Sequence, residues 1–161
     1  LYSLTDRLKD IQHLRTLRIH TRLPVVLPAR VDDGLIEWIT SQPVRVVMVI
    51  HCNHPNEIDD SVIAALDKLG AAGVTLLNQS VLLRNINDNV ATLTRLSQRL
   101  FAAGVLPYYL HQLDRVQGAA HFEVDIKRAR ILESGLRAAL PGYLVPRLVQ
   151  EVPGEPGKTP V

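Results

Sequence analysis

One lysine near the end of the chain stands in a loop made almost entirely of glycine and proline. The segment PGEPGKTP covers residues 153–160 and contains Lys158. Glycine allows the backbone to approach a bulky ligand closely, and proline fixes the path of the chain. A lysine amine on such a loop is a candidate nucleophile that forms an imine with a carbonyl compound. A solvated chain end is the alternative, and the loop alone leaves both interpretations open.

Clusters of polar residues follow the apolar, β-branched runs of the sequence. They are TR at 21–22, HCNH at 51–54, NQS at 78–80 and HQLD at 111–114. Because the carboxyl ends of parallel strands share one edge of a sheet, we expect the clusters to converge there. The candidate site residues are Arg22, His51, Gln79 and Asp114. Ordinary loop chemistry explains such clusters equally well.

The HCNH cluster also contains possible metal ligands. His51, Cys52 and His54 leave a strand on alternating faces, and the sequence has no second cysteine. We therefore predict no metal site made by this chain alone. The proline that follows favours a turn-forming role for this segment. Two other histidines, His20 and His111, are compatible with a buried structural role or a reactive one.

The elements that carry these clusters are predicted to form a parallel sheet with crossover helices, because β-branched runs alternate with amphipathic stretches. The expected strands are 16–20, 45–50, 74–77, 108–110 and 143–149, and the expected helices are 4–14, 32–42, 58–69, 90–100 and 125–140. Asn56 and Asn87 are candidate N-caps. Gly73, Gly104 and Gly142 are expected to end helices. The fold class predicted from this pattern is α/β.

The composition is that of one globular α/β unit, with 161 residues, 47% hydrophobic, 21% charged and a net charge of +2. Such a balanced charge gives no reason to expect nucleic acid or a membrane as partner. No apolar run reaches the roughly 18 residues of a membrane span, and the start does not resemble a signal peptide. We therefore predict a cytoplasmic protein. The lack of a nucleophile elbow, a P-loop or a dinucleotide-binding glycine motif disfavours those chemistries.

Six segments together identify a family. They are TRLPVVLPAR (21–30), HCNHPNEI (51–58), LLNQSVLLRNIND (76–88), PYYLHQLDRVQGAAHF (107–122), GYLVPRL (142–148) and PGEPGKTP (153–160). In this order they resemble the lysine 2,3-aminomutase family of radical S-adenosylmethionine enzymes. Residues 111–122 and 142–151 are most similar to the branch that makes (R)-β-lysine for modification of elongation factor P.

The resemblance implies a role for five residues. Lys158 matches the lysine that forms an imine with pyridoxal phosphate, and His51 and Gln79 match residues that contact S-adenosylmethionine. Asp114 matches the first of two carboxylates that bind the side-chain ammonium of substrate L-lysine. Glu151 stands where the second is usually an aspartate, so the charge is kept but its reach is longer by about one bond.

The resemblance also implies a 4Fe–4S cluster held by three cysteines, and a chain with only Cys52 cannot supply them. We therefore expect residues 1–161 to be the carboxyl-terminal part of a partial TIM-like (βα) barrel, inactive alone, with the cluster-binding part upstream. A homo-oligomer is possible. The alternatives are an aminomutase for another amino acid, a non-catalytic relic that binds pyridoxal phosphate or a nucleoside, and an unrelated barrel hydrolase or lyase.

Overall fold

The computed structural model describes residues 2–8, 10–114 and 116–161. Its centre is one sheet in which the strands follow the order of the chain. The strands are β1 (Thr16–Thr21), β2 (Arg45–Ile50), β3 (Thr75–Val81), β4 (Leu106–His111), β5 (Arg147–Gln150) and β6 (Thr159–Pro160). Each pair from β1 to β5 is parallel, and β6 runs antiparallel to β5. The structure therefore confirms the predicted α/β class.

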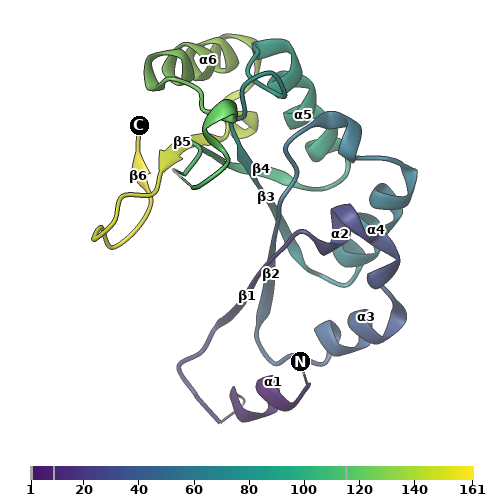
Figure 1. Ribbon diagram of the computed structural model, residues 1–161. Coiled ribbons are helices and arrows are strands. Elements are labelled where there is room, and N and C mark those ends of the chain that lie inside the picture. Colours follow the sequence, from purple (N-terminus) through teal and green to yellow (C-terminus); the bar gives the residue numbers. More distant parts are fainter. Residues whose placement is uncertain (1, 9, 115) are drawn as a thin grey trace.

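Helices connect the strands and lie together on one side of the sheet, whereas the hairpin that ends in β6 lies on the other (Figure 1). They are α1 (Tyr2–Leu8), α2 (Leu23–Val26), α3 (Asp33–Thr40), α4 (Asp60–Ala71), α5 (Val90–Ala102) and α6 (Ile126–Ala139), with 3-10 turns at Pro28–Arg30, Pro55–Glu57, Ala120–Phe122 and Gly142–Leu144. Sequential strand order with helices on one face is the arrangement of a (βα) barrel. Within the described residues, no strand pairing closes β1 onto β6.

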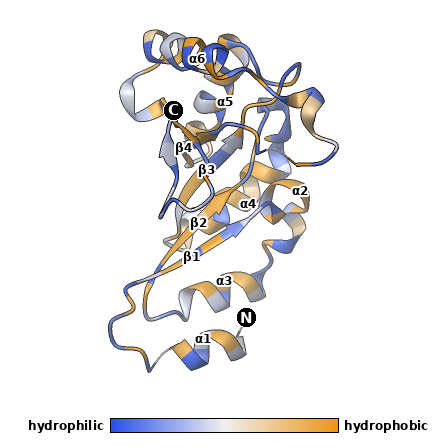
Figure 2. Cartoon of the chain, turned by 60° about the vertical axis from the view of Figure 1, so that its left-hand side comes forward, coloured by the Kyte–Doolittle hydropathy of each residue, from blue (hydrophilic) through white to orange (hydrophobic). Residues whose placement is uncertain are grey.

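Burial alternates along the strands because successive side chains point to opposite faces. In β2, Val46, Met48 and Ile50 pack into the core beneath the helices, where Trp38, Leu66 and Leu69 are buried. A second cluster lies under α5 and α6 around Leu110 and Leu132. Figure 2 shows hydrophobic residues along β1, β2 and α3, and hydrophilic residues in the loops near α6. None of the described helices is long and apolar enough to cross a lipid bilayer.

The helix boundaries differ from the sequence prediction at both N-caps. Asp59 caps α4 and Asn89 caps α5, each accepting a backbone N–H, so the predicted caps Asn56 and Asn87 are wrong. Gly73 and Gly104 have φ of 79° and 73° and end the α4 and α5 segments as predicted. Gly142 begins a 3-10 turn, and α6 ends at Ala139 instead.

Three strand predictions also change. Residues 78–80, expected to follow a strand, lie inside β3, which extends to Val81. The segment that starts at Tyr143 begins with a 3-10 turn, so β5 is confined to Arg147–Gln150. The expected loop that carries Lys158 leads into a short strand, because Gln150 and Val149 of β5 pair with Thr159 and Pro160.

Candidate functional site

The candidate site lies at the carboxyl ends of β2, β3 and β4, on the face that the helices leave open. Ile50, Asn78 and Leu110 are buried toward the helices. The residues that follow them, His51, Gln79 and His111, therefore point to the opposite face. The structure thus brings His51 and Gln79, two of the four candidate residues, to one face of the sheet together with His111.

Several polar atoms on this face are buried without a hydrogen-bond partner among the described residues. They are His51 Nε2, Gln79 Oε1 and His111 Nε2. Two further such atoms lie elsewhere, Gln112 Oε1 just past the end of β4 and Thr94 Oγ1 on α5. Leaving a buried polar group unpaired costs about 1–3 kcal/mol. Three such atoms at adjacent strand ends indicate a surface that a ligand or ordered water satisfies.

Lys158 is held over this face by the terminal hairpin. Its ammonium contacts Oε1 of Glu151, a pair that the adjacent β5–β6 strands bring together. The side chain of Lys158 is 22% exposed and that of Glu151 is 52% exposed. Lys158 Nζ also lies 5.9 Å from the centre of the Tyr109 ring. The lysine is therefore an ordered part of this surface and not a frayed end.

Burial and the charge of Lys158 keep the nearby imidazoles neutral. Desolvation lowers the pKa of His111 to about 4, with a further contribution from Lys158. Desolvation is also the main reason that the pKa values of His51 and His20 are lowered, and Lys158 acts on both. The pKa of Glu151 is lowered by its hydrogen bond with Lys158. At neutral pH this face therefore carries neutral imidazoles beside one ion pair.

An acidic cleft of about 690 Å³ opens next to this ion pair. Its lining residues are Gln112, Leu113, Asp114, Glu123, Val124, Asp125, Ile126, Gln150, Glu151, Val152 and Pro153. The structure thus places Asp114 and Glu151, two residues far apart in sequence, on one cleft. Four carboxylates and no basic side chain line it, as far as the structure describes the chain. Such a lining is suited to a cationic ligand.

The backbone beside His51 and Gln79 is fixed by a buried amide. Asn78 accepts a hydrogen bond from the Cys52 backbone N–H at 2.9 Å and donates to the Cys52 carbonyl at 3.0 Å. Ser80 donates to the same carbonyl at 2.8 Å. These bonds extend the β2–β3 pairing past the end of β2. Asn78 and Ser80 therefore hydrogen-bond to the backbone of Cys52. Gln79, between them, and His51, which precedes Cys52, carry the unpaired polar atoms.

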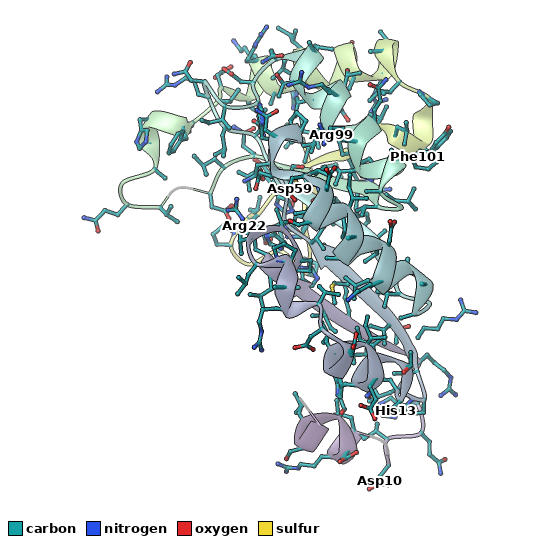
Figure 3. All side chains as sticks on the ribbon, turned by 90° about the vertical axis from the view of Figure 1, so that its right-hand side faces the viewer. Asp10, His13, Arg22, Asp59, Arg99 and Phe101 are labelled. Carbon is teal, nitrogen blue, oxygen red and sulfur yellow. The ribbon has the colours of Figure 1, made fainter. Side chains whose placement is uncertain are left out.

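A second network joins the loops after β1 and β2. Glu57 accepts the backbone N–H groups of Asn53 and His54 at 2.7 Å and 2.8 Å, and its other carboxylate oxygen binds Arg22 at 2.7 Å. Figure 3 shows Arg22 between the two halves of the chain, and Arg99 of α5 close to Asp59 at the start of α4. The Arg99 guanidinium contacts the carbonyl of Ile58. These contacts join the loop after β2 to the loop after β1 and to α5.

Comparison with known proteins finds relatives that share one name. No family model matches the chain. The chain is 52% identical over 158 residues to L-lysine 2,3-aminomutase of Escherichia coli (98% of this chain, 46% of the relative). The corresponding enzymes of Haemophilus influenzae and Clostridium subterminale are 51% and 41% identical over 97% and 100% of this chain, and 46% and 38% of their own lengths. The chain is homologous to the L-lysine 2,3-aminomutases.

This homology to the L-lysine 2,3-aminomutases confirms the family resemblance of the six segments. The chain spans about half the length of the curated relatives it matches. Among solved structures, a radical SAM methyltransferase from Sphaerobacter thermophilus superposes with a TM-score of 0.55 at 19% identity, covering 73% of this chain and 37% of that one. The likeness extends to the fold, which is therefore shared with a radical SAM protein.

As an aminomutase homologue, the chain offers no ligand set for an iron–sulfur cluster. No group of three or more potential metal ligands occurs among the described residues. Cys52 is fully buried, and desolvation raises the pKa of its thiol to about 12. A protonated, inaccessible thiol is a poor iron ligand.

The sequence pattern gave no definite role to three residues of the candidate site. It left His111 ambiguous and gave Gln112 and Tyr109 no role, although all three lie in the segment PYYLHQLD. The sequence does place His111 and Gln112 directly after an expected strand, which is where site residues are predicted to gather. Their unpaired atoms and the position of Tyr109 beneath Lys158 emerge only from the folded chain. The roles assigned to Lys158, His51, Gln79, Asp114 and Glu151 stay predictions.

Proposed function

We propose that the complete protein is an L-lysine 2,3-aminomutase, an isomerase that converts L-lysine to β-lysine by moving the amino group from C2 to C3. Homologues of that name support the proposal. The observation that carries it is the acidic cleft shared by Asp114 and Glu151, with Lys158 paired to Glu151 at its edge. A cationic group in that cleft lies next to the amine proposed to hold the cofactor.

The residues present are suited to two of the three cofactors. Lys158 supplies the amine for pyridoxal phosphate, and the unpaired atoms of His51 and Gln79 are available to S-adenosylmethionine. When bound, a reduced 4Fe–4S cluster with S-adenosylmethionine supplies a radical that removes hydrogen, and pyridoxal phosphate supplies the ring that assists amino migration. Cys52 does not provide a cluster site, so the cluster ligands are proposed to lie in a part of the protein outside this sequence.

This chain's own contribution is to bind and orient. Asp114 and Glu151 are proposed to hold the distal ammonium of lysine by charge-assisted hydrogen bonds. Fixing that end restricts where the C2–C3 bond of an extended substrate can lie, and such positioning is a large part of enzymatic rate enhancement. A distal carboxylate, as in glutamate, would be repelled by the same pair. We therefore propose lysine as the substrate and glutamate as a non-substrate.

The proposal is tested by turnover of the complete protein. It is reconstituted anaerobically with iron, sulfide, S-adenosylmethionine and pyridoxal phosphate, and is assayed with lysine, ornithine and glutamate. Chromatographic detection of β-lysine from lysine, with little product from the other two, is the expected result. A preference for glutamate would exclude the lysine assignment, and absence of any product would favour a non-catalytic binding protein.

We further propose that β-lysine from this enzyme serves the modification of elongation factor P, and that the protein is cytoplasmic. The first rests on the resemblance of residues 111–122 and 142–151 to that branch, and the second on the need of radical chemistry for a reducing compartment. Loss of β-lysyl-modified elongation factor P on deletion of the gene, measured by intact-protein mass spectrometry, is the expected result.

A further inference from the structure

The acidic cleft is lined by an uncharged polar residue, Gln112, that no proposed role uses. Gln112 lies two residues before Asp114 and lines the same cleft. Its backbone N–H donates to the carbonyl of Val149 at 2.8 Å, so the residue is fixed between β4 and β5. The backbone from which the Gln112 side chain projects is therefore held in place by the sheet.

The orientation of the Gln112 amide is determined by its neighbour. Its Nε2 group donates to the backbone carbonyl of Val124, whose side chain is 3% exposed. A carbonyl only accepts hydrogen bonds, so the NH₂ end of the amide must face Val124. The Oε1 end is left as an acceptor, and it is buried with no partner in the described part of the chain.

A primary ammonium has three N–H donors. The proposed clamp of Asp114 and Glu151 accounts for two of them, one for each carboxylate, and leaves the third to another acceptor of the cleft lining. Gln112 lines the same cleft, and its Oε1 is an acceptor without a partner in the described part of the chain. A trimethylated ammonium has the same charge but no N–H donor, so this acceptor distinguishes the two ligands whereas charge alone does not.

We propose that Gln112 is a specificity-determining residue that accepts the third hydrogen bond of the substrate's distal ammonium. The inference rests on the proposed aminomutase function. It makes the cleft selective for a primary ammonium over a methylated one, because only the primary ammonium supplies a donor to an acceptor that is otherwise unpaired. The affinity for lysine then depends on the number of hydrogen bonds to its distal ammonium as well as on its charge.

The test uses the complete, cofactor-loaded protein and the variant Gln112→Leu. The kcat/KM for lysine is compared with the inhibition constant of Nε-trimethyl-lysine, which is measurable whether or not it turns over. We expect Gln112→Leu to lower kcat/KM for lysine by about tenfold to a hundredfold, as for a lost hydrogen bond to a charged group. The inhibition constant of trimethyl-lysine should change less than about threefold.

Thr94→Val is the matched control, because it also removes a buried, unpaired oxygen but lies on α5 outside the cleft lining. It should leave both constants unchanged. If Gln112→Leu does not fold, as judged by circular dichroism, Gln112→Met is used, since methionine has similar length and adapts to its surroundings. Equal losses of affinity for lysine and trimethyl-lysine, or unchanged lysine kinetics, in Gln112→Leu would overturn the inference. In that case wild-type turnover of lysine would still support the proposed function. A wild type inactive on lysine would remove both.

Discussion

At the scale of single residues, Glu151 connects two proposed roles. Its carboxylate pairs with Lys158 and also lines the cleft that contains Asp114. Glu151 is more exposed than Lys158, so its orientation is set largely by this pairing and by the β5–β6 hairpin. The cofactor lysine and the substrate clamp are thus adjacent, as chemistry on one bound amino acid requires.

Lys158 is expected to be the amine that carries pyridoxal phosphate. Lys158→Ala in the complete protein should abolish the adduct that borohydride reduction fixes on the chain, because the amine that forms it is gone. Mass spectrometry of the peptides locates the adduct. Lys68→Ala is the control, since Lys68 lies on α4 near Asp33 at 3.9 Å. An adduct mapped to Lys68 or Lys127 would contradict the assignment.

The carboxylate clamp predicts a graded series of effects on lysine turnover. Asp114→Asn should lower kcat/KM for lysine by at least about tenfold, since a hydrogen bond to a charged group contributes roughly 1.5–3 kcal/mol. Glu151→Gln should behave similarly, and Glu151→Asp should be mild because the charge is kept. Steady-state assays with lysine and ornithine give these values, and unchanged lysine turnover in Asp114→Asn would rule out the clamp.

Burial of His111 predicts a stability that depends on pH. The unfolded chain protonates this imidazole below its ordinary pKa near 6.5, whereas the folded chain keeps it neutral down to about pH 4. The free energy of unfolding of the cofactor-free protein should therefore fall as pH drops from 6.5 to 4, by about 1–3 kcal/mol from this residue. Urea titrations of wild type and His111→Asn measure it. Equal pH slopes for both proteins would contradict the prediction.

At the scale of elements, the contact between α5 and α6 depends on a glycine. A Cβ at Gly135 of α6 would lie 2.5 Å from Val90 Cγ2 at the start of α5. The two helices also enclose the second hydrophobic cluster, around Leu132 and Leu136. Close approach of the helices is therefore part of how β4 and its site residues are covered.

Gly135→Ala is expected to destabilise the protein by about 1–3 kcal/mol through overpacking, although alanine is the better helix former. Val90→Ala in the same background should restore most of the loss, because it removes the clashing methyl groups. Gly70→Ala in α4 is the control, since nothing lies within 4 Å of its added carbon. Thermal unfolding of the four proteins measures the effect, and a stabilised Gly135→Ala would show that the contact yields easily.

At the scale of the whole molecule, the sheet is open at β1 and the described chain presents a half-barrel with its site on the uncovered face. Chains of this kind bury less surface than a closed barrel, and the unpaired polar atoms of the site remain on that face. The proposed activity accordingly depends on ligands that pair with these atoms.

The 161-residue chain, expressed by itself, is expected to take up no 4Fe–4S cluster and to show no aminomutase activity. One buried thiol with a pKa of about 12 cannot replace three thiolates. Anaerobic reconstitution followed by iron and sulfide analysis tests this. A stoichiometric 4Fe–4S absorption signal on this chain would show that cluster ligands other than cysteine are available.

Much of the fold followed from local pattern. The strands 45–50 and 16–20 and the α4 and α5 helices were predictable because burial repeats every two residues in strands and about every 3.6 in helices. The caps were not, because Asn56 and Asn87 have the same chemistry as the true caps Asp59 and Asn89. Which of several nearby polar residues accepts the first N–H depends on how each helix sits on the sheet.

The sequence by itself determined the α/β class, the family segments and the chemical types available, namely a loop lysine, strand-end histidines and amides, and two carboxylates. Only the tertiary structure decided that Lys158 pairs with Glu151, that Asp114 shares a cleft with it, and that Gln112 lines the same cleft and has an unpaired Oε1. The reason is that local periodicity specifies which face a residue occupies. Distances between residues on different strands are set by the pairing of β4, β5 and β6, which no local pattern encodes.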